Sequence, residues 1–169
     1  MTTQTAIHHP AIALSTVRHK DGVSILRVFS REHGVVGCLV RQGVKGPRRA
    51  RHLQAPLALL DLVGMRHMKE ELYRFDRADR VMAQDRTTAE VPRSAIAMFL
   101  AECVMRTFDS GTAHAEVFDA LWAAAERIER EVAIGRLHLA FLVDAVAISG
   151  LKPDAPVRPP QGMERFNLA

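Results

Sequence analysis

The spacing of apolar residues changes between residues 82 and 90, and this change constrains the fold more than any other feature. Before it, short apolar runs separated by turn signals are typical of β-strands. After it, apolar residues recur every three or four positions, as on one face of an α-helix. A chain of 169 residues can form one compact domain or two small ones that share an interface. The sequence therefore predicts an α+β protein in which the strands come first.

Five strands are predicted in the first 82 residues. Asp21 and Gly22 lie between two β-rich runs and are a strong hairpin signal. A second turn, from Glu32 to Gly34, leads into a strand apolar enough to be buried on both faces. The predicted strands cover residues 11–17, 23–30, 35–40, 55–65 and 72–82. Five short antiparallel strands suit a small closed barrel, and the OB-fold is the common barrel of this size.

Three helices are predicted in residues 90–152. The first begins at Pro92, and Thr112 is the predicted cap of the second. The third, residues 137–149, is apolar almost all round and is expected at the centre of the helical domain. The apolar stripes of the first two consist of Ile96, Phe99, Leu100, Cys103, Val104 and Phe108, and of Phe118, Leu121, Trp122, Ala125 and Ile128.

The predicted organisation is therefore an OB-fold over residues 1–82, a helical domain over 90–152 and an extended proline-rich tail over 153–169. The two domains should pack together, because three short helices alone make a thin core. Cys38 and Cys103 form no paired motif and are expected to be reduced thiols. Charge interrupts every apolar stretch before about 18 residues, so a cytoplasmic protein that does not span a membrane is expected.

Positive charge is concentrated in the first half of the chain. Residues 1–80 hold 14 Lys and Arg against 7 Asp and Glu, whereas residues 81–169 hold 9 against 12. No acidic residue occurs between Glu32 and Asp61, and glycines in this basic segment let the backbone approach a phosphate. This asymmetry predicts a polyanion partner for the first half. The candidate nucleic-acid contacts are Arg41, Lys45, Arg48, Arg49 and Arg51, with Arg18 and Lys20 of the first turn extending the surface.

Few aromatic side chains are available to stack on bases. The predicted barrel contains only Phe29, Tyr73 and Phe75, whereas binders of single strands usually combine a basic groove with stacking aromatics. We therefore expect binding dominated by the nucleic-acid backbone, tolerant of sequence and sensitive to salt.

No set of residues predicts catalysis. His8 and His9 have no Cys or His partner at metal-ligand spacing, and neither does the His114-Ala115-Glu116 motif. The chain contains no phosphate-binding loop and no nucleophile elbow. We expect a protein that is not an enzyme and that has no metal and no cofactor.

Seven segments, taken in order, resemble the RecO family of bacterial recombination mediators. That family opens with an apolar strand, a second strand ending in Phe-Ser or Phe-Thr before a turn to Gly, and a basic loop that contains Gly. A Gln-Pro entry to the fourth strand, a Leu-x-Glu helix and a late helix with a Gly-x-x-Pro stop follow. The matching segments are residues 11–14, 25–34, 41–45, 54–57, 99–102, 137–142 and 150–153.

The resemblance implies an N-terminal OB-fold and a helical domain. RecO-like proteins bind single- and double-stranded DNA, anneal strands and help load recombinase, working with RecR and with the acidic tail of single-stranded DNA-binding protein. It also implies action at the nucleoid and DNA contacts at the loop residues named above. Many members carry a cysteine zinc motif after the late helix, which this chain lacks, and the chain is shorter than is usual for the family.

Two other functions are compatible with the same residues. A protein-interaction adaptor would act through its helical domain, with the basic segment incidental. An OB-fold RNA binder would prefer RNA through contacts to the 2′-hydroxyl group.

Overall fold

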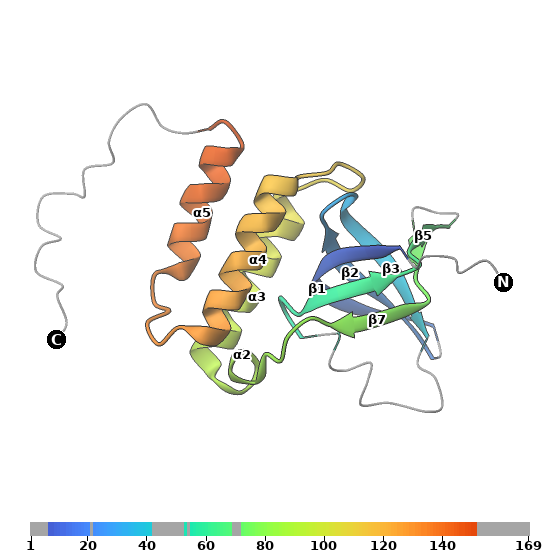
Figure 1. Cartoon of the computed structure of the whole chain (residues 1–169), viewed down its shortest axis with the longest axis horizontal. Coiled ribbons are helices and arrows are strands. Elements are labelled where there is room, and N and C mark those ends of the chain that lie inside the picture. Colours follow the sequence, from blue (N-terminus) through green and yellow to red (C-terminus); the bar gives the residue numbers. More distant parts are fainter. Residues whose placement is uncertain (1–6, 21, 42–52, 54, 69–71, 152–169) are drawn as a thin grey trace, which may run out of the picture.

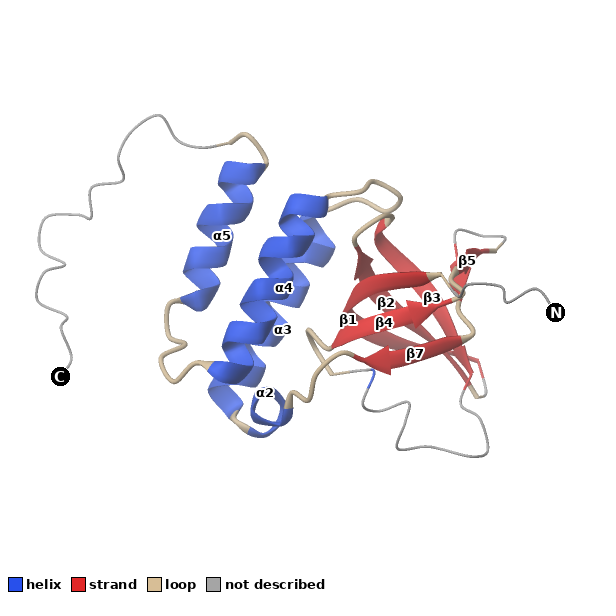
Figure 2. Cartoon of the chain, viewed as in Figure 1, coloured by secondary structure: helices blue, strands red, loops and turns tan. Residues whose placement is uncertain are grey.

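A curved sheet of strands lies beside a layer of helices (Figure 1). The computed structural model describes residues 7–20, 22–41, 53, 55–68 and 72–151. The seven strands precede the helices α2 to α5, as Figure 2 shows, so the α+β prediction is confirmed. The predicted tail, 153–169, lies outside the described residues. The elements are β1 (His8–Lys20), β2 (Val23–Ser30), β3 (Gly34–Arg41), β4 (Leu59–Val63), β5 (Arg66–His67), β6 (Leu72–Arg74), β7 (Arg77–Arg80), α2 (Asp85–Ala89), α3 (Val91–Thr107), α4 (Ala115–Arg130) and α5 (Leu137–Ile148).

The first three strands form the predicted meander. β2 has the predicted bounds, and Gly22 adopts the positive φ of 71° that the first turn requires. β1 is longer than predicted because both of its edges are paired, one with β2 and the other with β4. The fourth strand is shorter than predicted, since Leu57 has a left-handed φ of 57° that interrupts extended structure before Leu59.

The predicted closed barrel is wrong, although the sheet is OB-fold-like. The strand order is β5-β6-β3-β2-β1-β4-β7, and no ladder joins β5 to β7 in the described part of the chain. The predicted fifth strand is divided into β6, which pairs in parallel with β3, and β7, which pairs antiparallel with β4. Phe75 and Asp76 form the bend between them. Near the two edges of the sheet, β6 and β7 are therefore linked covalently by these two residues and not by a ladder of hydrogen bonds.

An ion pair holds this bend in place. Arg66 donates hydrogen bonds of 3.0 and 2.7 Å to the two carboxylate oxygens of Asp76. Gly64 has a φ of 68°, and a Cβ there would lie 2.4 Å from Asp76 Oδ2, so only glycine lets the carboxylate approach. The hydrogen bond from Arg66 holds the pKa of Asp76 below its ordinary value.

Hydrophobic residues pack on both faces of the sheet. Alternate residues of β1 point to opposite faces, so Ala11 and Ala13 lie in the concave interior while Ile12 and Leu14 face the helices. Phe29 is fully buried at the junction, with ring centroids 5.9 Å from Phe108 and 5.8 Å from Phe118. Burial of such a ring contributes roughly 1.5–3 kcal/mol, so the sheet and the helices stabilise each other.

Helix α2 was not predicted, and two side chains attach it to the rest of the fold. Gln84, just before it, is buried. Its side-chain oxygen accepts a hydrogen bond of 3.0 Å from the Leu59 amide of β4, and its side-chain nitrogen donates one of 2.9 Å to the Leu57 carbonyl in the preceding turn. Glu129 of α4 accepts hydrogen bonds from the backbone amides of Arg86 and Thr87 at 3.0 and 2.8 Å. Although burial opposes it, these bonds lower the pKa of Glu129.

The long helices differ from the prediction in three respects. α4 begins at Ala115 after His114, so the predicted cap by Thr112 is wrong. Phe99, predicted on the buried stripe of α3, is 44% exposed. α5 was expected at the centre but lies at the outer edge of the helical layer (Figure 1), where it packs mainly against α4 and α3.

The outer face of α5 is apolar. Its exposed side chains include Leu139, Val143, Val146 and Ile148, whereas Leu137, Phe141 and Ala145 are buried. An apolar pattern all round a helix therefore does not show how many neighbours the helix has. None of the described helices has both the length and the apolar content needed to cross a membrane.

Candidate nucleic-acid interface

Three of the seven predicted contact residues lie at one end of the sheet. Lys20 of β1 and Arg41 of β3 both pair with Val23 of β2, so the three form one row across the strands. Neighbouring strands are about 4.8 Å apart, which places the backbones of Lys20 and Arg41 roughly 10 Å from each other. Arg18, which is exposed, pairs with Ser24 in the next row, on the opposite face of the sheet. The first turn and the start of the basic segment therefore share this end of the sheet.

The other four predicted contacts, Lys45, Arg48, Arg49 and Arg51, lie outside the described residues. In the sequence they follow Arg41, the last residue of β3, whose backbone pairs with Val23 at the start of β2.

Arg27 is a fourth cation on the same strands and was not among the predicted contacts. Leu26 and Val28 are fully buried in the sheet interior, so Arg27 between them points to the outer face, where it is exposed. It pairs with Ser15 and Gly37 on the neighbouring strands. The alternation of β2 was the signal that places Arg27 outside.

The floor around Arg27 is apolar and partly open to solvent. Val17, Ile25 and Leu39 form the adjacent row on the same face, and Val17 is 53% exposed. Gly37 has no side chain, and a Cβ there would lie 3.0 Å from Leu72 Cδ2 and 3.3 Å from Ile25 Cγ2. No side chain therefore projects from β3 at Gly37, and the helices cover the Phe29 end of the face. In OB-folds, the face of the second and third strands is where oligonucleotides bind.

The carboxylates of the described sheet are engaged elsewhere. Asp61 lies 2.6 Å from His8, Glu32 2.9 Å from His9, Asp76 2.7 Å from Arg66 and Asp79 2.6 Å from Arg77. Among the described residues, no ion pair is recorded for Arg18 or Arg27. The uncovered outer face therefore has positive charge at Arg27 that the described carboxylates of the sheet do not neutralise.

Comparison with known proteins connects the sheet to one family. The family model described as "Recombination protein O N terminal" matches residues 1–83. The DNA repair protein RecO of two Porphyromonas gingivalis strains, ATCC 33277 and W83, is 28% identical over 148 residues, or 85% of this chain. Residues 1–83 belong to the RecO family. It spans 60% of the length of these curated relatives.

The RecO resemblance seen in the sequence is thereby confirmed. The match to the RecO N-terminal model ends at residue 83, and the last strand ends at Arg80, so the model covers the whole sheet and stops before α2. The uncovered outer face therefore belongs to the part of the chain that carries the family match.

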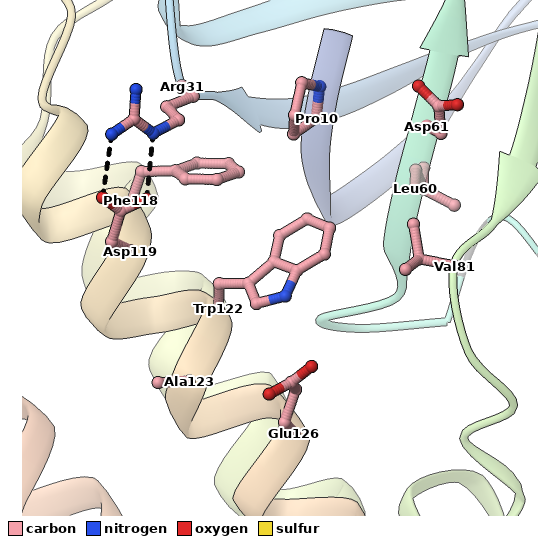
Figure 3. A pocket seen from close by; sticks show the side chains of 10 residues that line it. All are labelled: Pro10, Arg31, Leu60, Asp61, Val81, Phe118, Asp119, Trp122, Ala123 and Glu126. Carbon is pink, nitrogen blue, oxygen red and sulfur yellow. Dashed lines mark hydrogen bonds and ion pairs between the residues drawn. The ribbon is translucent and has the colours of Figure 1, made fainter. Parts of the chain in front are cut away.

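A second surface of the chain has the opposite charge to the outer face of the sheet. It is a cleft of about 540 Å³ between the sheet and α4, with Trp122 facing Leu60 and Val81 across it (Figure 3). Asp61, Asp119 and Glu126 line it, and Arg31 binds Asp119 through two hydrogen bonds of 2.9 and 3.0 Å. Three carboxylates with one engaged arginine repel phosphate, so the cleft is not part of the candidate interface.

The thiols of the chain are poorly suited to catalysis. Cys38 is fully buried on β3, and burial raises its pKa to about 12. A thiol with this pKa is protonated at neutral pH and is a poor nucleophile. Cys103 is half-buried, and burial raises its pKa as well.

Proposed function

We propose that this chain binds single- and double-stranded DNA and promotes strand annealing and recombinase loading in recombinational DNA repair. It acts by holding phosphates, without making or breaking covalent bonds, and it works in the cytoplasm at the nucleoid. Arg27 lies on the outer face, Arg18, Lys20 and Arg41 lie at the end of the same strands, and Lys45, Arg48, Arg49 and Arg51 extend the surface.

One observation carries this proposal. The sheet that matches the RecO N-terminal family has an outer face with an apolar floor and with an arginine, Arg27, that no carboxylate of the described sheet pairs. One arginine guanidinium can donate two hydrogen bonds to the oxygens of one phosphate. An apolar surface can contact the faces of unpaired bases. The name "DNA repair protein RecO" of the curated relatives supports DNA as the polyanion.

Protein partners follow from the family rather than from a described contact. We propose RecR and the acidic tail of single-stranded DNA-binding protein as partners of the chain. In this proposal DNA binds to the sheet and the protein partners bind to the helical layer.

The proposal is tested by measuring affinity for a single-stranded DNA oligomer across a salt series. Two variants remove cations of the surface, Arg18→Ala/Arg27→Ala and Arg48→Ala/Arg49→Ala/Arg51→Ala. The slope of log affinity against log salt is expected to become shallower by about 0.7 for each phosphate that the variant no longer binds. The decrease is then about 1.4 for the double variant and about 2 for the triple variant.

A matched control removes arginines that are already paired. Arg106→Ala/Arg127→Ala removes two helical cations that contact Glu102 and Glu131 at 2.5 and 2.7 Å, so the salt slope should not change. Slopes that are equal in all four proteins would overturn the DNA surface and favour an adaptor that acts through its helices. Tighter binding of an RNA oligomer of the same sequence would indicate an RNA binder.

A further inference from the structure

Two histidines and a glutamate meet where β1 begins and where the β2–β3 turn lies. His9 Nδ1 is 2.9 Å from Glu32 Oε2, and His33 Nε2 is 3.8 Å from the same oxygen. One ligand atom of each residue lies within 4.8 Å of the others. The register explains the meeting, because Ala11 pairs with Ser30, and His9 and Glu32 are each two residues beyond that pair.

We infer that His9, Glu32 and His33 bind a divalent transition-metal ion of the zinc class. Zinc bonds of about 2.0–2.2 Å to nitrogen and oxygen in a tetrahedral site place neighbouring ligand atoms about 3.3 Å apart. The separations of 2.9 and 3.8 Å are on either side of that value. The longer one exceeds a hydrogen bond, yet it fits two atoms bridged by a metal.

The donor set selects the metal. Two imidazole nitrogens and one carboxylate favour zinc, cobalt, nickel or copper, whereas magnesium and calcium prefer sites made of oxygen alone. Three protein ligands leave a fourth position of a tetrahedral zinc ion for water or another donor.

The three ligand side chains differ in exposure, so one of them is held in place by the fold while the other two are accessible from solvent. The His9 side chain is 11% exposed and is therefore fixed by its surroundings, whereas those of Glu32 and His33 are 55% and 35% exposed. The Tyr73 ring lies beside His33, with centroids 5.2 Å apart. An ion can therefore enter from solvent and find one ligand already in place.

The site lies next to the contact between the sheet and the helices. Gly34 follows His33, and a Cβ at Gly34 would lie 2.1 Å from the backbone oxygen of Thr112, so the turn packs directly on the α3–α4 connection. A metal that joins β1 to this turn would stabilise that junction as any ligand of the folded state does.

The inference is tested by titrating the untagged full chain with zinc chloride in a calorimeter. Wild type should bind one zinc ion, and His33→Ala and Glu32→Gln should each lose at least about tenfold in affinity, which is the effect of losing even an outer partner of a metal ligand. His19→Ala, which removes an exposed histidine at the far end of β1, should bind like wild type. Cobalt should give the visible absorption of a tetrahedral site in wild type but not in His33→Ala.

Two results would overturn the site. One is the absence of zinc binding by wild type, and the other is an affinity in His33→Ala and Glu32→Gln equal to that of wild type. Circular dichroism shows whether each variant is folded, and because Glu32 is largely exposed, Glu32→Gln keeps the test decisive if His33→Ala does not fold.

Discussion

Arginines of the helical layer and arginines of the sheet face are used in different ways. On the helices, arginines pair with glutamates three or four residues away, as Arg86 and Arg93 do with Glu90. On the outer face of the sheet, Arg27 forms no ion pair with any described residue. The cause is local, because glutamates are interspersed along the helices, whereas the cross-strand neighbours of Arg27 are Ser15 and Gly37, which carry no charge. The same side chain therefore stabilises structure in one region and is available to a ligand in the other.

The largest expected effect comes from the buried helical arginine. Arg93 is 2% exposed and donates to the backbone oxygen of Ile128 and to Glu90. Arg93→Ala leaves a buried carbonyl without its partner, and the free energy of unfolding should fall by about 2–3 kcal/mol in urea denaturation. The folded fraction of the variant should bind DNA with the same affinity as wild type. A decrease in DNA affinity larger than the decrease in folded protein would contradict the division of roles.

Removing the carboxylate that caps α2 should have a smaller effect. Glu129→Ala leaves the amides of Arg86 and Thr87 without an acceptor, which should cost about 1 kcal/mol at pH 7. The pKa of Glu129 is lower in the folded chain, so its stabilisation is complete above the ordinary glutamate value of 4.5 and is lost as pH falls through the folded pKa. Melting curves of both proteins should therefore converge in acid, and a difference that persists there would contradict this account.

Arg27→Ala is expected to separate binding from stability. The side chain is exposed, so the free energy of unfolding should change by no more than about 0.5 kcal/mol. Because the variant binds one phosphate fewer, the salt slope of DNA binding should become shallower by about 0.7. Unchanged DNA binding would remove Arg27 from the interface.

The smallest effect is expected for an exposed helical pair. Arg106→Ala breaks a contact of 2.5 Å with Glu102 between side chains that are 78% and 50% exposed. Such a pair contributes about 0.3–0.5 kcal/mol, so the free energy of unfolding obtained from thermal denaturation should decrease by no more than that amount. A larger decrease in stability would show that exposed ion pairs on the helices stabilise the fold more than we expect.

Local patterns predicted the strands of the meander well because turn glycines and alternation are encoded within a few residues, as at Gly22. The bend at Phe75 and Asp76 was missed, since it depends on a clamp from Arg66 and Gly64 at a distance in the sequence. The position of α5 was missed for a related reason, because its composition does not specify how many neighbours it has. Arg27 could have been chosen from the alternation of β2, whereas the His9–Glu32–His33 cluster depends on strand register across 24 residues.

The double pairing of β1 has a consequence for the order of folding. β1, β2 and β3 pair with neighbours in sequence, whereas β4 must return to β1 and place Leu60 opposite Ala11. Contacts between residues close in sequence form fastest, because long loops lose more entropy on closure. We therefore expect the three-stranded meander to form first and to act as the template on which β4 and β7 assemble. Substitutions in the meander should then slow folding, whereas those in β7 should mainly accelerate unfolding.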